Sequence, residues 1–358
     1  MPDTEELSKS KLRHYADILN PLFTPDEFNY SHRLLEFVCT LVRAAGLEDA
    51  GWDSYQESLA FLEDLKCLGS LDLPSDRFPD PNATRTRLYL IAYCHAIEMN
   101  MPYELIANLL RVRLGRKYVI QPFRHLEPVP KKGKKPTLNS SRRPLSPEAK
   151  IKEIERLSAE ASLPEVGAAL RGVYDSVIRN AVYHSDYVVH DGSMRLLSAY
   201  RASKTENIMT QKVSFEELMG VIDEAFAFFS ALIILHNRAC RSFRGFDKTM
   251  IPFDGYYKGL LEIIFKDQEM IGFRTYWPNQ NVCLYSRAKE GCTAQNIVFE
   301  ADGSINFMVG LFETNPGAFS PLVEKDCEPS YAEVPAALSR PYWPHDLRPY
   351  TLDSVATD

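Results

Sequence analysis

The chain has 358 residues, of which 45% are hydrophobic and 25% charged, a composition typical of a globular protein and not of a disordered one. The formal net charge of −7 excludes a protein that binds polyanions over its whole surface, so any contact with nucleic acid has to come from a local basic region. The length predicts two domains or one large one.

The cysteines and apolar stretches indicate a cytoplasmic protein. Seven scattered cysteines form no C-x-x-C pair, and the eight histidines do not fall at zinc-ligand spacings beside them. We therefore expect reduced thiols, no metal and no cofactor. The acidic, polar start of the chain predicts no signal peptide. The longest apolar stretch, Ala225–Leu235, is about half the length of a membrane span and predicts a core helix.

The first 80 residues are predicted to form an N-terminal helical segment. Apolar residues recur at helical spacing in His32–Ala45 and again in Tyr55–Leu68. The stretch Leu73–Asn82 then holds three prolines in ten residues, which indicates a boundary or a long turn.

A helical domain is predicted from residue 84 to about 250. It opens with one helix over Thr84–Asn100 and a second that begins near Pro102 and ends at Gly115. Between residues 128 and 144 lies a loop rich in proline, serine and basic side chains. Its cations are Lys131, Lys132, Lys134, Lys135, Arg142 and Arg143. They predict either an arm that grips RNA phosphates or a solvated linker.

The second half of this domain carries strong helix-start patterns. Ser146 and Pro147 predict a helix that reaches Glu160, and Pro164 opens a helix expected to continue to Ala181. Alternating residues in Met194–Tyr200 and Ile208–Val213 predict an inserted β-hairpin. Ser214-Phe-Glu-Glu217 is a capping box that opens a long helix to about Arg241.

After Gly255 the hydrophobic pattern changes to a period of two. Strands are predicted at Leu261–Phe265, Ile271–Trp277, Val282–Tyr285, Ile297–Glu300 and Ile305–Phe312. Asp302-Gly303 between the last two is a hairpin-turn signal. Residues 255–315 are thus a small antiparallel β-rich domain, followed by a proline-rich tail at 316–358. The predicted fold class is α+β, mainly helical.

The residues best suited to chemistry stand close together near position 180. Asn180 and His184 are four residues apart on one helix face, and Arg179 lies beside them. An arginine holds phosphate oxygens with a permanent cation, and a histidine moves protons near neutral pH. These are the side chains that a metal-free cleavage of a phosphodiester requires.

Arg-Asn-x-x-x-His at the end of an amphipathic helix resembles the R-x(4–6)-H motif of the HEPN superfamily. The resemblance covers paired helices, a variable loop, the motif helix and a capped helix, over residues 84–250. Many members are metal-independent endoribonucleases of toxin, abortive-infection and anti-phage systems, with an active site formed where two motif helices meet in a dimer. The resemblance implies catalytic roles for Arg179, Asn180 and His184, a homodimer, RNA as substrate and a regulatory protein partner. The inserted hairpin departs from the minimal four-helix form.

A structural alternative explains the same residues without catalysis. Asp175 precedes Arg179 by four residues, the spacing of an ion pair on a helix surface. Asn180 would then pair with His184, and His184 would satisfy carbonyl groups at the helix end. In that case the protein is a non-catalytic HEPN-like module that binds a nucleotide or a partner protein.

Overall fold

The structure is a computed structural model of the whole chain. It describes residues 4–24, 33–44, 54–64, 67, 71–127, 145–190, 192–196, 211–246, 250–254, 258–276, 282–288, 291–300 and 303–307. The basic loop at 128–144 and the tail at 316–358 lie outside these residues. The described chain combines helices with small antiparallel sheets, so the predicted α+β class is confirmed.

Before the basic loop, the described residues form the helices α1 (Thr4–Phe23), α2 (Leu34–Leu41), α3 (Ser54–Asp64), α4 (Pro81–Glu98) and α5 (Asn100–Arg113). α1 was not predicted, whereas α2 to α5 lie where helical periodicity placed them. α5 ends as expected at Gly115, whose φ of 72° is a left-handed conformation that favours glycine. Two short 3-10 helices, Arg124–Leu126 and Phe243–Phe246, complete the helical elements named here.

After the basic loop, the described part of the chain forms α6 (Pro147–Glu160), α7 (Pro164–Gly172), α8 (Ser176–Tyr183) and α10 (Phe215–Ser242). Their starts agree with the local sequence. The Ser146 side chain accepts a hydrogen bond from the backbone N–H of Ala149, and Pro147 is the first residue of α6. Ser214 and Glu217 form the predicted capping box of α10.

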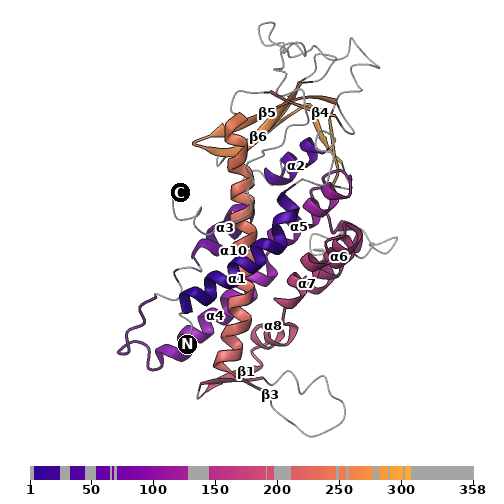
Figure 1. Cartoon of the computed structure of the whole chain (residues 1–358). Helices are drawn as coiled ribbons and strands as arrows, with labels where there is room; N and C mark the ends of the chain where they lie inside the picture. The colour runs from indigo at the N-terminus through magenta and orange to yellow at the C-terminus, as the bar shows by residue number, and fades with distance from the viewer. Residues whose placement is uncertain are drawn as a thin grey trace, which may run out of the picture.

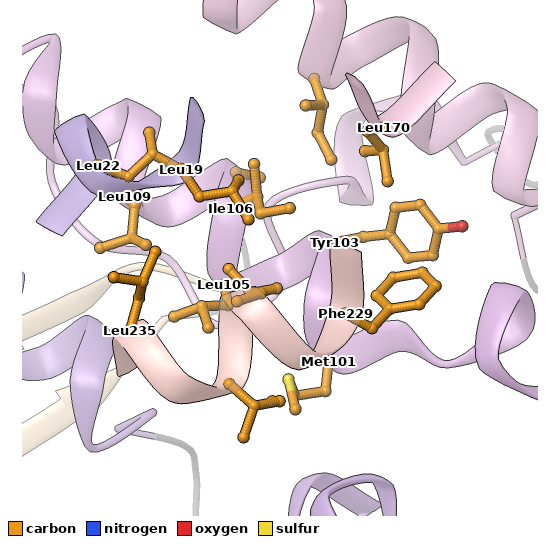
Figure 2. Close-up of a cluster of buried hydrophobic side chains, with 14 of the residues drawn as sticks. Leu19, Leu22, Met101, Tyr103, Leu105, Ile106, Leu109, Leu170, Phe229 and Leu235 are labelled. Carbon is orange, nitrogen blue, oxygen red and sulfur yellow. The ribbon is translucent and has the colours of Figure 1, made fainter. Parts of the chain in front are cut away.

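α10 is the central helix of the molecule. Figure 1 shows it running from the small sheet of β1–β3 at one end to the β4–β6 region at the other. It contacts α1 most extensively, and it also packs against α4 and β6. Figure 2 shows Phe229 and Leu235 of α10 among buried side chains that include Tyr103 and Leu105 of α5 and Leu170 of α7. This helix therefore supplies the common core of the protein.

α10 is long and apolar enough to cross a membrane when length and composition alone are considered. It is the one candidate span among the described residues, and half of its most apolar part is buried inside the protein. The aromatic rings of Phe228 and Phe229 are fully buried against neighbouring elements. This packing is that of a core helix, as the sequence predicted.

The inserted hairpin is one part of a three-stranded sheet. Its strands are β1 (Tyr187–His190), β2 (Ser193–Leu196) and β3 (Gln211–Ser214), in the order β1-β2-β3. β2 and β3 are the antiparallel pair that the sequence predicted. β1 was not predicted, and it connects this sheet directly to the end of α8.

In the C-terminal region, the residues that the structure describes form one sheet of five strands and one of two. The larger sheet is an antiparallel meander of β4 (Met250–Asp254), β5 (Lys258–Lys266), β6 (Glu269–Tyr276), β7 (Val282–Ala288) and β8 (Gly291–Gln295). The smaller pairs β9 (Ile297–Phe299) with β10 (Ile305–Phe307) across the predicted turn at Gly303. β4 and β8 were not predicted, and β4 begins before Gly255. One face of the large sheet buries Phe273 and Tyr285 in the common core.

Two glycines test how tightly the sheet and α10 are packed. A Cβ on Gly272 of β6 would lie 2.1 Å from the carbonyl oxygen of Tyr285, which belongs to rigid sheet backbone. We expect Gly272→Ala to lower the free energy of unfolding by about 1–3 kcal/mol because β6 and β7 must separate. Gly220→Ala in α10 meets no atom within 4 Å and should raise stability by roughly 0.5–1 kcal/mol. Urea unfolding of both variants measures the difference, and equal stabilities would contradict this packing.

Candidate functional site

The motif residues lie on a separate short helix. The sequence predicted one helix from Pro164 to Ala181, but α7 ends at Gly172 and α8 begins at Ser176. Tyr93 of α4 bridges this break. Its buried hydroxyl donates to the carbonyl of Val173 at 3.2 Å and accepts from the N–H of Asp175 at 2.8 Å. The hydroxyl of one tyrosine thus satisfies two backbone groups at the junction of α7 and α8, and it fixes α8 against α4.

Asp175 caps α8 and is not the ion-pair partner that its spacing suggested. Its Oδ1 accepts hydrogen bonds from the N–H groups of Val177 and Ile178 at 2.8 and 2.9 Å. An N-cap aspartate satisfies backbone donors that otherwise lack a partner inside the helix. The expected pair between Asp175 and Arg179 is therefore wrong, because the carboxylate points at the backbone and the guanidinium points at another helix.

Arg179 binds Glu98, the last residue of α4, which lies 81 residues earlier in the chain. Arg179 Nε donates to Glu98 Oε1 at 2.7 Å, and Nη2 donates to the same oxygen. Both side chains are about one-quarter to one-third exposed. Burial lowers the pKa of Arg179, but the hydrogen bonds and charge of Glu98 raise it above its ordinary value, so the guanidinium is cationic.

Two neighbours on α8 hold the rest of the guanidinium. Arg179 Nη1 donates to Asn180 Oδ1 at 2.9 Å, and the guanidinium carbon lies 4.9 Å from the centre of the Tyr183 ring. An arginine over an aromatic face gains a further electrostatic attraction. Asn180 therefore orients Arg179 and does not pair with His184, contrary to the structural alternative drawn from the sequence.

His184 is the C-cap residue of α8, and its side chain is exposed. Its backbone N–H donates to the carbonyl of Asn180 at 3.0 Å, which places the imidazole at the end of the helix. Ser185 follows with a φ of 56° and turns the chain into β1. Within the described residues, the imidazole forms no hydrogen bond with Arg179 or Asn180. The structure thus joins Arg179 to Asn180 and leaves His184 beside them, open to solvent.

Two cations, Arg179 and Lys150, interact with Glu98. Lys150 of α6 is 4% exposed, and its Nζ donates to Asn100 Oδ1 at 2.5 Å. Burial lowers the pKa of Lys150, while the charges of Glu104 and Glu98 favour its protonated form. Glu98 ends α4, where the helix dipole disfavours a carboxylate. Arg179 and Lys150 offset that cost at the junction of α4, α6 and α8.

Cys94 lies one helical turn before Glu98 and is buried. Burial raises the pKa of its thiol to about 12, although the charge of Arg179 acts in the opposite direction. Cys94 is therefore a neutral core residue at physiological pH and not a nucleophile.

Exposed apolar side chains surround the motif helix. Among the described residues the large exposed ones include Ile91 of α4 (57%), Val177 (38%) and Tyr183 (50%) of α8, and Val188 of β1 (48%). α4 contacts both α8 and β1, so these residues belong to neighbouring elements. We call them the apolar surface.

The remaining predicted site residues belong to the basic loop. Its six cations, Lys131, Lys132, Lys134, Lys135, Arg142 and Arg143, lie outside the described residues. Within the described part of the chain, no three His, Cys, Asp or Glu side chains gather in a way that could hold a metal ion.

Comparison with protein-family models, with curated proteins and with solved structures finds no match for the chain.

Glu98 and Tyr93 were missed by the sequence analysis. Both lie on α4 and reach the motif through the tertiary fold, and no local pattern marks them. A charged residue at the unfavourable end of a helix was the one available signal, since Glu98 there requires a cation nearby.

Tyr93→Phe tests the attachment of α8. The substitution keeps the ring but leaves the N–H of Asp175 and the carbonyl of Val173 without their buried partner. We expect a loss of about 1–3 kcal/mol in the free energy of unfolding. Tyr183→Phe is the control, because the half-exposed Tyr183 hydroxyl makes one long bond of 3.4 Å to Cys94 and its loss should be nearly neutral. Equal effects of the two substitutions would contradict the role of Tyr93.

Proposed function

We propose that this protein is a metal-independent endoribonuclease of the HEPN type that works as a cytoplasmic homodimer. The observation that carries the proposal is the fixed orientation of the Arg179 cation on α8. An exposed histidine, His184, ends the same short helix. The HEPN-like bundle, the RNA substrate and the membership of a toxin or anti-phage defence system follow from the motif's resemblance and belong to the same proposal.

The contacts of Arg179 leave it able to bind a phosphate. A guanidinium has five N–H groups, and within the described chain three are used, two by Glu98 and one by Asn180. One N–H on Nη1 and one on Nη2 remain. Two such donors can bind two oxygens of a phosphate and stabilise the extra negative charge of the pentacovalent phosphorane.

The reaction needs two proton transfers and no metal. The 2′-oxygen of a ribose attacks the adjacent phosphorus, and a base removes its proton as the new P–O bond forms. The P–O bond to the 5′-oxygen breaks, and an acid donates a proton to that leaving oxygen. An imidazole performs either transfer near neutral pH. His184 supplies one such group per chain, so two chains supply both.

The apolar surface supports the proposed dimer. Ile91, Val177 and Val188 would lose contact with water if a second copy covered them, and burial of each contributes to association. A second copy docked there would bring its own His184 close to the first. The basic loop would add further phosphate contacts to a chain whose net charge is −7.

One observation favours the second candidate, a non-catalytic module that binds a nucleotide or a partner protein. The Arg179–Glu98 pair joins α4 to α8 and would stabilise the fold without any reaction. In that case Arg179 and Glu98 are a structural pair, and the apolar surface receives a regulatory protein.

The first test is cleavage of RNA in EDTA. We expect wild-type protein to cleave RNA, to leave a 5′-hydroxyl and a cyclic or 3′-phosphate, and to spare DNA, which has no 2′-hydroxyl. His184→Ala and Arg179→Ala should each lower the rate by about two to four orders of magnitude. Asn180→Ala should have a smaller effect, because Asn180 contacts Arg179 and not the substrate.

Stability measurements separate catalysis from folding in the same variants. His184→Ala should leave the unfolding free energy unchanged, since the side chain is exposed. Arg179→Ala should cost at most about 1 kcal/mol, the range for a partly exposed ion pair. Wild-type protein that never cleaves RNA, together with a strongly destabilised Arg179→Ala, would favour the non-catalytic module.

The second test concerns the dimer. Ile91→Glu places a charge in the apolar surface and should convert the dimer to a monomer at micromolar concentration, with loss of cleavage. Leu71→Glu is the matched control, because Leu71 is also exposed (44%) but precedes α4 and is not on the motif elements. Light scattering measures both. A wild-type protein that is strictly monomeric and fully active would refute the shared site.

A further inference from the structure

We infer that Glu98 is a positioning residue of the site, which turns the free N–H groups of Arg179 toward the phosphate. The inference rests on the proposed function and extends it to a residue outside the motif. Glu98 does not touch the substrate. It acts through the guanidinium, which it holds from the end of α4.

The edge of the guanidinium that Glu98 occupies supports this role. Nε and Nη2 lie on one side of the planar group, and both donate to Glu98 Oε1. A carboxylate competing with phosphate would bind the terminal nitrogens Nη1 and Nη2, which form the edge most accessible to a ligand. Glu98 instead binds the side edge and leaves a donor on each terminal nitrogen.

Three contacts from three directions make this orientation specific. Glu98 holds one edge, Asn180 accepts from Nη1, and the ring of Tyr183 lies against the flat face. An exposed arginine otherwise samples many rotamers, and this freedom is lost when it binds a phosphate. Fixation within the folded chain removes that cost and sets the geometry before the substrate arrives.

The electrostatic surroundings keep Glu98 suited to this task. Its carboxylate interacts electrostatically with the cation of Lys150 as well as with that of Arg179. When the guanidinium shares its charge with a phosphate, Lys150 still offsets the negative charge of Glu98 at the end of α4.

The same protein contains a matched pair that serves as a control. Arg171 of α7 donates through Nε and Nη2 to Glu155 of α6, at 3.0 and 2.9 Å. Their side chains are about one-third exposed, close to the values for Arg179 and Glu98. Glu155→Ala thus removes an equivalent link between two helices without touching the motif.

The test is steady-state RNA cleavage by full-length Glu98→Ala, Glu98→Gln and Glu155→Ala. We expect Glu98→Ala to lower kcat by about 100-fold, the scale of a misplaced catalytic group, while KM changes by less than about threefold. The large change in kcat and the small change in KM arise because the guanidinium stabilises the transition state more than the bound substrate. Glu98→Gln keeps an oxygen acceptor at the same place, so its kcat should be at least about tenfold higher than that of Glu98→Ala. Glu155→Ala should cleave like the wild type.

Four results would overturn the inference. Glu98→Ala with wild-type kcat would make the pair purely structural, and a higher kcat would make Glu98 a competitor of the phosphate. Glu98→Gln as slow as Glu98→Ala would exclude orientation through the oxygen acceptor. An equal loss in Glu155→Ala would assign the effect to general loosening of the helices. Wild-type protein that fails to cleave RNA is a separate outcome, because it removes the proposed function itself and this assignment with it.

Discussion

The burial of one long helix, α10, sets the positions of the elements that pack around it. α10 has apolar residues on most of its circumference, so neighbours must cover it on several sides. α1 and α4 pack along it, and β6 packs near its C-terminal end. Since α4 is held in this way, its last residue, Glu98, has a fixed place, and α8 is attached to α4 through Glu98 and Tyr93. The position of the motif is thus a consequence of the core.

In the proposed site, the arginine and the histidine are held in different ways. Arg179 is fixed by contacts within one chain, whereas the imidazole of His184 is exposed at the end of a short helix. An arginine binds a phosphate more favourably when the fold already orients it. The entropy cost of ordering the side chain is then part of folding and not of binding. A histidine that exchanges protons with substrate benefits from access. In the proposed dimer, a second chain would cover the exposed apolar residues of α4, α8 and β1 and complete the site.

Local signals were predictable from the sequence, and contacts distant in the chain were not. The caps at Ser146 and Ser214, the end of α5 at Gly115 and the turn at Gly303 depend on a few neighbouring residues, and each was predicted. The helical spacing of α1 is present in the sequence but is obscured by many charged residues. The break between α7 and α8 is bridged by Tyr93, and the orientation of Arg179 depends on Glu98, each 80 or more residues away. For the same reason, spacing suggested the wrong partner for Arg179.

The most direct measurement is a structure of the wild-type protein bound to an RNA whose 2′-oxygens are methylated, so that the nucleophile is blocked. We expect a phosphate with its oxygens within hydrogen-bond distance of Nη1 and Nη2 of Arg179, and Glu98 still bound at Nε. We also expect a His184 imidazole from each of two chains beside the same phosphodiester. RNA bound elsewhere, or Arg179 bound only to Glu98 with no phosphate beside it, would contradict the proposed site.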